Sequence, residues 1–475
     1  MNYHLVTLGC QMNKSDSERI ASAIDKLGFN WTDNEENADL LGIVACSVRQ
    51  KAIDKVYTRI HKWNSWKNKK NIVTFITGCI LPVDREKFLK LFDLIFQISE
   101  LSQFPEMLRT YGVVTPFSLS TQKEIITEFN TLVFNNNKKT IVGRPIQMKK
   151  PETNISDFWQ IEPRYQSSFE AFIPIQNGCD KFCTFCAVPY TRGREISRPS
   201  DEILTELKSL VHKGYKSITL LGQNVNSYGL DKKGEELSFA HLLEKIGKYG
   251  KKSGKDFWLY FTSPNPCDMS DEVLRVMSRY DCLAKQVHLP LQSGDDKVLI
   301  RMNRNHTVND FRNIAKSIKN YLPSATFFTD IIVGFTGETN GQFMNTVKIM
   351  EEIRFNMAYI ARYSPRPGAA SSRWDDNVSH ATKRNRLHKL SALLQEHSLE
   401  HNRSMIGKTY KVLVTGRDRK NGYLTGHTEG RIIVRFATEN ENLFGNFVDI
   451  TITSAAEFAT EGNLKHVYNE ELTEA

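Results

Sequence analysis

Short apolar runs alternate with amphipathic stretches over the first hundred residues. Each apolar run is followed by a segment whose apolar positions recur with helical spacing. The three pairs are residues 3–8 and 15–27, 40–45 and 51–63, and 71–78 and 84–91. This alternation predicts strands and helices that build an open parallel α/β sheet.

A cysteine stands where the chain leaves each of these three predicted strands, at Cys10, Cys46 and Cys79. The carboxyl ends of parallel strands meet at one edge of a sheet, where ligands collect in open α/β folds. A single cysteine in such a place is usually a small buried hydrophobe. Three successive strands that end alike predict a shared metal site instead.

A second alternation begins after residue 169 and has different strands. Its apolar runs are residues 171–176, 217–222, 257–262, 285–291, 326–335 and 357–363. Its helical stretches are residues 201–213, 239–249, 270–279, 307–320 and 340–353. Six such repeats predict a full or partial parallel (β/α) barrel, in which the chemistry lies on the loops after the strands.

Three cysteines crowd the first of these loops, in "NGCDKFCTFCAVPYTRG". Cys179, Cys183 and Cys186 have the spacing C-x3-C-x2-C, and soft thiolates favour iron–sulfur clusters or zinc. A closed zinc site needs a fourth ligand, and no histidine lies between Cys179 and His212. A [4Fe-4S] cluster held by three cysteines leaves one iron open, which is typical of a site that binds and activates a ligand.

Short β-branched runs separated by glycine-containing turns follow residue 405, at 408–418, 422–428, 431–436 and 447–455. They predict a small antiparallel β-barrel of the OB-like kind. Its basic side chains are candidates for phosphate contacts and two aromatic residues are candidates for base stacking. These are Arg417, Arg419, Lys420, Arg431 and Arg435, with Tyr423 or Phe436.

The amino-acid composition narrows the class of protein further. The 475 residues are 40% hydrophobic and 10% aromatic, which favours several packed domains over disorder. The formal charge of +9 indicates a polyanionic partner, although a solvated surface accounts for it equally well. We see no secretory signal and no apolar run near the roughly 20 residues that cross a bilayer. We expect a cytoplasmic protein with reduced cysteines, in which Cys267 and Cys282 are incidental thiols.

Seven stretches of the sequence together resemble the radical S-adenosylmethionine methylthiotransferase family. The N-terminal ones are "TLGCQMNKSDSE", "ACSVRQKA" and "TGC"; the central ones are "NGCDKFCTFCAVPYTRGREISRPSDEI", "LLGQNVNSYG", "HLPLQSG" and "DIIVGFTGET". The resemblance covers almost the whole chain. Within the family, "GCQMN" and "PYTRGRE" resemble the branch that acts on isopentenyl-adenosine in tRNA.

The resemblance implies four segments. They are an N-terminal methylthiotransferase domain at 1–112, a linker with an inserted hairpin at 113–168, a radical S-adenosylmethionine domain at 169–404, and a TRAM RNA-binding domain at 405–475. The fold class is then multidomain α/β: an open parallel sheet, a partial (β/α) barrel and a small OB-like β-barrel.

It also implies the chemistry. The Cys179, Cys183 and Cys186 loop would hold one [4Fe-4S] cluster and the three N-terminal cysteines a second. The expected reaction is methylthiolation of carbon 2 of the isopentenyl-adenosine next to the anticodon in tRNA. S-adenosyl-L-methionine would serve as both radical source and methyl donor. A radical is needed because the unactivated C–H at carbon 2 of adenine offers no acidic proton to a side-chain base. Gln223, Asn224 and Ser293 are the expected contacts of S-adenosylmethionine. The expected partners of this monomer are tRNA and an electron donor of the flavodoxin or ferredoxin type.

Some positions depart from the family pattern. Thr336 replaces a proline, the Pro264–Pro266 stretch of "FTSPNP" replaces Ser-His-Pro, and Val44-Ala45 replaces Asn-Thr before Cys46. None of them removes a cysteine, so they bear on activity and substrate geometry rather than on the reaction class.

Other interpretations remain open at this point. A methylthiotransferase of this kind can act on a ribosomal-protein aspartate or on threonylcarbamoyl-adenosine in tRNA. A two-cluster electron-transfer protein that binds RNA, and a zinc-stapled RNA-binding module, belong to different classes. A basic helical face formed by Lys55, Arg59 and Lys62 is either solvated or contacts phosphate.

Overall fold

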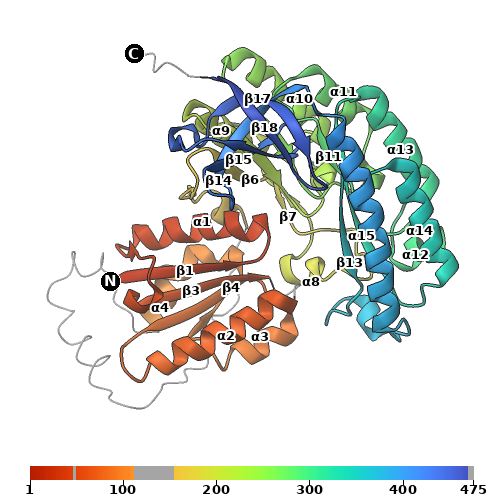
Figure 1. Ribbon diagram of the computed structural model, residues 1–475. Helices are drawn as coiled ribbons and strands as arrows, with labels where there is room; N and C mark the ends of the chain where they lie inside the picture. Colours follow the sequence, from red (N-terminus) through yellow and green to blue (C-terminus); the bar gives the residue numbers. More distant parts are fainter. Residues whose placement is uncertain (47–49, 112–154, 469–475) are drawn as a thin grey trace, which may run out of the picture.

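The computed structural model describes residues 1–46, 50–111 and 155–468 (Figure 1). The predicted hairpin at 124–148 and most of the predicted linker lie outside these residues. None of the described helices is long and apolar enough to cross a membrane.

The N-terminal part is a five-stranded parallel sheet in the order β2-β1-β3-β4-β5. Helix α2 and Phe88 of α3 cover one face, and helices α1, α4 and α7 cover the other. The central strand β3 is buried along its whole length, which explains its continuous apolar sequence. The bounds are β1 Asn2–Leu8, α1 Gln11–Lys26, β2 Asn30–Trp31, β3 Leu40–Cys46, α2 Gln50–Trp66, β4 Val73–Cys79, α3 Pro82–Phe88, β5 Leu94–Ile95, α4 Phe104–Thr110 and α7 Ile155–Trp159.

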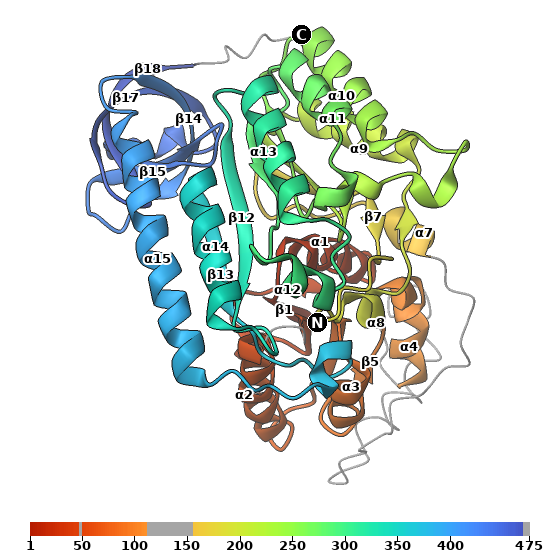
Figure 2. The same ribbon diagram turned by 90° about the vertical axis from the view of Figure 1, so that its right-hand side faces the viewer.

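The central part is a partial barrel of six parallel strands, as the sequence predicts. It consists of two three-stranded sheets, β10-β9-β6 and β11-β12-β13, joined by an isolated bridge between Leu259 and Leu283. Helices pack on the outside through one continuous apolar core (Figure 2). The strands are β6 Glu170–Pro174, β9 Ser217–Leu221, β10 Trp258–Phe261, β11 Gln286–His288, β12 Thr326–Val333 and β13 Met357–Arg362. The helices are α9 Ser200–His212, α10 Phe239–Ser253, α11 Asp271–Arg279, α12 Asp296–Arg301, α13 Val308–Tyr321 and α14 Asn340–Ile353.

A long helix, α15 (His380–Arg403), leads to a closed C-terminal barrel in the order β14-β15-β16-β18-β17. The barrel strands are β14 Thr409–Arg417, β15 Tyr423–Thr428, β16 Ile433–Ala437, β17 Phe447–Ala455 and β18 Thr460–Val467. The sequence analysis missed β18, because its largely exposed, polar residues carry little apolar alternation.

The C-terminal barrel docks at the amino ends of the central strands. The Trp258 and Phe447 rings meet edge to face with centroids 4.6 Å apart, and Arg431 lies 3.8 Å from the centre of the Tyr260 ring. The N-terminal domain contacts the central part through α1, where Met12 packs with Phe172 of β6 and Leu221 of β9. The two flanking domains both reach the first strand of the partial barrel, where Glu170 pairs with Lys14 of α1 at 3.5 Å and with Arg431 of the C-terminal barrel at 3.8 Å.

Candidate active site with two sets of three cysteines

The N-terminal cysteines lie at the carboxyl edge of the sheet. Cys46 ends β3 and Cys79 ends β4, and the two are direct partners in the parallel register, in which neighbouring strands lie about 4.8 Å apart. Cys10 immediately precedes α1 and is exposed, whereas the other two are buried. The strand ends therefore adjoin, as predicted.

Asn13 and Gly78 hold this edge together. Buried Asn13 donates from Nδ2 to the Ala45 carbonyl at 3.0 Å, and its Oδ1 accepts from the Cys10 amide at 3.4 Å. Gly78 has φ of 108°, and a Cβ there would meet the Ala45 carbonyl at 2.3 Å. Only glycine fits so close an approach in that conformation.

Opposing electrostatic effects act on these thiols. A hydrogen bond with Cys46 and burial raise the pKa of the Cys79 thiol, while the Arg192 guanidinium acts in the opposite direction. The amino end of α1 points its partial positive charge at Cys10. Metal ligation deprotonates such thiols, since the thiolate is the ligand.

The other three cysteines occupy the loop between β7 (Gln176–Asn177) and α8 (Val188–Arg192). The Thr184 amide donates to the Met302 carbonyl at 3.1 Å, and Asn303 donates from Nδ2 to the Phe182 carbonyl at 3.0 Å. Phe185 packs in an apolar cluster with Met302 and neighbouring side chains. These contacts hold the cysteine loop against the segment that follows α12.

Burial raises the pKa of Cys179 to about 11 and that of Cys186 to about 12. Arg304, which the sequence analysis missed, places Nη1 3.5 Å from the Cys183 sulfur and donates from Nη2 to the Pro290 carbonyl at 3.1 Å. In the N-terminal set, Arg192 donates from Nε to the Cys79 sulfur at 2.9 Å. Each set of three cysteines therefore has one arginine directed at one of its sulfurs.

The residues expected to contact S-adenosylmethionine are placed as follows. Asn224 is buried after β9, and its Oδ1 has no hydrogen-bond partner; the same is true of Gln223 Oε1. Ser293 is fully buried, and its hydroxyl accepts from the Asp295 amide at 3.3 Å. Gln176, which the sequence analysis missed, lies against Gly222 with both side-chain polar atoms unpartnered.

A charged network adjoins these amides. Lys181 Nζ lies 2.7 Å from Asp268 Oδ2, which also accepts from Asn224 Nδ2 at 2.8 Å. Nearby, Ser227 donates to Glu195 Oε1 at 2.5 Å, and burial raises the pKa of Glu195 to about 7. The proline-containing stretch that departs from the family pattern leads directly into η5 (Pro266–Asp268), the turn that carries Asp268.

The residues present fit an iron–sulfur cluster with an organic ligand. The unpartnered amide atoms of Gln176, Gln223 and Asn224 lie after β6 and β9, on the same edge as the cysteine loop. Buried polar atoms are normally satisfied, so these indicate a bound polar group. Within the described ranges, no three His, Cys, Asp or Glu side chains are spaced for a single metal ion.

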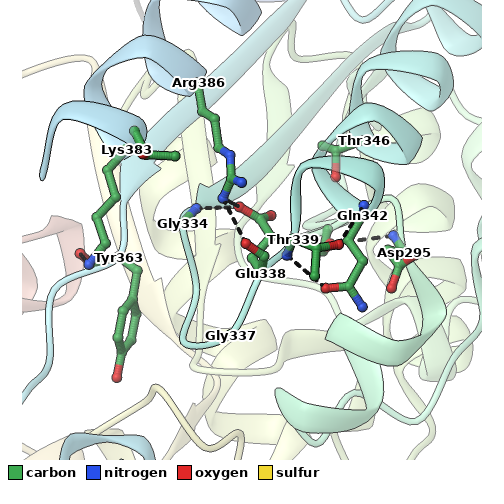
Figure 3. Close-up of polar contacts among 12 residues, drawn as sticks. Asp295, Gly334, Gly337, Glu338, Thr339, Gln342, Thr346, Tyr363, Lys383 and Arg386 are labelled. Atoms are coloured by element: carbon green, nitrogen blue, oxygen red, sulfur yellow. Dashed lines mark hydrogen bonds and ion pairs between the residues drawn. The ribbon is translucent and has the colours of Figure 1, made fainter. Parts of the chain in front are cut away.

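The "GFTGET" turn after β12 is closed by a buried ion pair (Figure 3). Glu338 Oε2 accepts from the Gly334 amide at 2.6 Å and from Arg386 Nη1 at 2.6 Å. Arg386 lies on α15, so the pair ties this turn to the helix that leads to the C-terminal barrel. Thr336, where the family pattern has proline, lies in the same turn, and its buried Oγ1 has no partner.

The structure corrects part of the RNA-contact prediction. Phe436 is fully buried in the barrel core, so the prediction that it stacks on a base is wrong. Arg431 faces Tyr260 of the central barrel. Arg59 and Lys62 both pair with Glu35 at 2.9 Å, and this one carboxylate offsets one of the three positive charges on that helical face.

The two remaining cysteines lie outside both sets. Cys282 is partly buried against Gly250, and Cys267 is exposed and donates to the Asn305 carbonyl at 2.9 Å.

Comparisons with known proteins match each part of the chain. The Radical SAM superfamily model matches residues 173–350, the model of Uncharacterized protein family UPF0004 matches residues 2–98, and the TRAM domain model matches residues 403–465. Among solved structures, the radical S-adenosylmethionine methyltransferase TsrM from Kitasatospora setae has a TM-score of 0.52 at 12% identity, covering 78% of this chain and 75% of that one. At that identity the likeness shows the fold alone.

Curated relatives match over nearly the full length. A tRNA-2-methylthio-N(6)-dimethylallyladenosine synthase from Thermoanaerobacter sp. (strain X514) is 34% identical over 473 residues, 98% of this chain and 93% of the relative. The synthase of the same name from Yersinia pseudotuberculosis serotype O:3 (strain YPIII) is 35% identical over 469 residues, 97% and 92% of the two chains.

The partial parallel barrel, with its C-x3-C-x2-C loop after the first strand, makes this chain a radical S-adenosylmethionine enzyme. Membership of that superfamily implies a [4Fe-4S] cluster and S-adenosylmethionine. The full-length matches then place it more narrowly: the chain belongs to the methylthiotransferase family that contains the tRNA-2-methylthio-N(6)-dimethylallyladenosine synthases.

Proposed function

We propose that this enzyme transfers a methylthio group to carbon 2 of N6-isopentenyladenosine, which is N(6)-dimethylallyladenosine, next to the anticodon in tRNA. The observation that carries the proposal is the presence of two separate three-cysteine sets, each with a directed arginine, in a chain that matches such synthases over its full length. Two such sets suit a reaction that needs both a radical and a sulfur.

Each set has a separate role in the proposal. Cys179, Cys183 and Cys186 would hold the cluster that binds S-adenosylmethionine, and Gln176, Gln223 and Asn224 would orient that molecule through their unpartnered amide atoms. Cys10, Cys46 and Cys79 would hold a second [4Fe-4S] cluster, the source of the sulfur. S-adenosylmethionine supplies the 5′-deoxyadenosyl radical and the methyl group.

The residues of the chain bind and shield these groups. Lys181 and Asp268 neutralise each other beside Asn224, which fixes that amide without leaving a net charge next to the cofactor. Ser293 holds its loop through the Asp295 amide and, in this proposal, approaches S-adenosylmethionine from the fourth strand. The target base lies in a single-stranded loop and can therefore be turned out of its stack and into the barrel.

We assign the segments 1–112, 113–168, 169–404 and 405–475 to sulfur transfer, connection, radical generation and RNA binding. The matched ranges of the three family models support this division. A monomer in the cytoplasm, reduced by a flavodoxin or ferredoxin type of donor, is the form in which we expect it to meet tRNA.

The test is an anaerobic assay. The reconstituted enzyme is incubated with dithionite, S-adenosylmethionine and tRNA bearing isopentenyl-adenosine, and the digested tRNA is analysed by nucleoside mass spectrometry. We expect the 2-methylthio nucleoside, and its loss in Cys179→Ala and in Cys10→Ala. Formation of 5′-deoxyadenosine without that product would point to another target, such as threonylcarbamoyl-adenosine or a ribosomal-protein aspartate. Absence of both from a fully clustered preparation would favour electron transfer.

A further inference from the structure

Arg192 reaches out of the radical domain and contacts a cysteine of the N-terminal domain. It ends α8, six residues after Cys186, and donates from Nε to the Cys79 sulfur at 2.9 Å. The two residues are 113 positions apart in the chain. One side chain therefore connects the segment that carries one set of cysteines to a sulfur of the other set.

The other nitrogens of Arg192 hold it in this direction. Nη2 donates to Asp16 Oδ2 at 2.5 Å, and Nη1 donates to Asn177 Oδ1 at 3.1 Å. The Arg192 side chain is 5% exposed and that of Asp16 is 1% exposed. A buried guanidinium is costly to keep unless its donors are satisfied, so this three-way contact gives the side chain a single orientation.

Of the three groups that accept from Arg192, the Cys79 sulfur is the unusual one. Asp16 already balances the charge of Arg192, and Asn177 satisfies a further donor. A thiol sulfur is only a weak acceptor, whereas a thiolate bound to iron carries negative charge and accepts strongly. The contact therefore suits a ligated Cys79 better than a protonated one.

We propose that Arg192 is a positioning residue for the N-terminal cluster: through a charged hydrogen bond to the Cys79 sulfur it raises the reduction potential of that cluster and fixes the cluster against the radical domain. The inference rests on the proposed function, since it requires a cluster on Cys10, Cys46 and Cys79. Reduction adds one negative charge to a cluster, and a cation with an N–H donor at a ligand sulfur stabilises that charge.

The experiment uses the full-length chain with Cys179, Cys183 and Cys186 all changed to alanine, so that only the N-terminal set can bind iron. After reconstitution, the midpoint potential of the remaining cluster is measured by a redox titration followed by electron paramagnetic resonance. Arg192→Gln is compared with this parent. We expect a more negative potential, equal to about a tenfold loss in the reduction equilibrium constant, or about 59 mV for one electron.

Arg194→Gln is the matched control. Arg194 lies two residues away, is 74% exposed and pairs with Asp180, so its loss should leave the potential unchanged. Arg192→Lys keeps the charge but cannot reach three acceptors at once, and we expect an intermediate shift. If Arg192→Gln does not retain its cluster, Arg192→Lys carries the test.

Two outcomes overturn the inference in distinguishable ways. A cluster whose potential is the same in the parent and in the Arg192 variants refutes the role of Arg192 and leaves the proposed function intact. A parent that binds no iron at all refutes the second cluster, and with it both the proposed function and this inference.

Discussion

Cys46 and Cys79 stand side by side as the last residues of neighbouring parallel strands. Two thiols in that register present their sulfurs to the same edge of the sheet, and both are buried. The pairing follows from the parallel alignment of β3 and β4, which starts at Leu40 and Val73 and runs without a bulge to the two cysteines.

We expect Cys46→Ala to remove one of the two clusters. Iron bound per chain should fall by about half, while 5′-deoxyadenosine formation without tRNA product persists, because the radical loop is untouched. Iron analysis and nucleoside mass spectrometry check both results. Cys282→Ala is the control, since that residue packs against Gly250 outside both sets. Full iron content in Cys46→Ala would argue against the second site.

Arg304→Gln should impair the radical site. Arg304 points Nη1 at the Cys183 sulfur, and loss of such outer contacts typically costs about 10- to 100-fold in metal affinity or activity. The rate of S-adenosylmethionine cleavage measures the effect. Arg312→Gln, which loses an exposed pair with Glu352, should cleave at the parent rate. Equal rates in all three proteins would exclude a role for Arg304.

Glu338→Gln should destabilise the central domain. It leaves Arg386 buried without its carboxylate, and breaking a buried ion pair costs about 3–5 kcal/mol in the free energy of unfolding. Chemical denaturation followed by fluorescence measures this change. Glu352→Gln, which breaks the exposed pair with Arg312, should cost about 0–1 kcal/mol. Similar losses in the two variants would mean that burial of the pair does not matter.

Glu18 should make stability depend on pH. Burial raises its pKa from 4.5 to about 7, against the opposing effects of the Gln166 amide, Lys14 and Arg19 and with a smaller contribution from Glu170. The folded state thus binds the proton more tightly than the unfolded state. The resulting contribution of Glu18 to the free energy of unfolding is fully present below about pH 4.5 and is lost as the pH rises through about 7.

We therefore expect the Tm to fall between about pH 5 and pH 8, and Glu18→Gln, which cannot ionise, to lose that component of the fall. Differential scanning fluorimetry across this range measures it. Glu162→Gln, at a position 77% exposed, should keep the parent profile. Identical profiles for the parent and Glu18→Gln would contradict the assignment.

Arg419→Ala with Lys420→Ala should weaken tRNA binding. Both residues are exposed on the C-terminal barrel, and each phosphate contact that is lost should lower the slope of log affinity against log salt by about one. Binding measured from low to moderate salt tests this. Lys316→Ala, on the exposed face of α13, should keep the parent slope. An unchanged slope in the double variant would place the RNA elsewhere.

Much of the architecture could be predicted because hydrophobic periodicity is local. The continuous apolar run of β3 and the helical spacing of α1 and α2 predicted a parallel sheet, and the structure has one. The alternation of exposed and buried residues along β16 also predicts where Phe436 lies. Arg435 faces outward there, so its neighbour Phe436 has to face the core.

Local pattern also placed Cys46 and Cys79 at the ends of their strands, since a strand that ends at either residue is recognised from its own residues. It could not reveal that Arg192 points at Cys79 or that Arg386 meets Glu338, because those contacts join segments 113 and 48 residues apart. Periodicity states which face of an element is buried, but the partner of a buried charge depends on how whole domains pack. The packing of the N-terminal domain against β6, β9 and α8 therefore decided how the two sets of cysteines are connected.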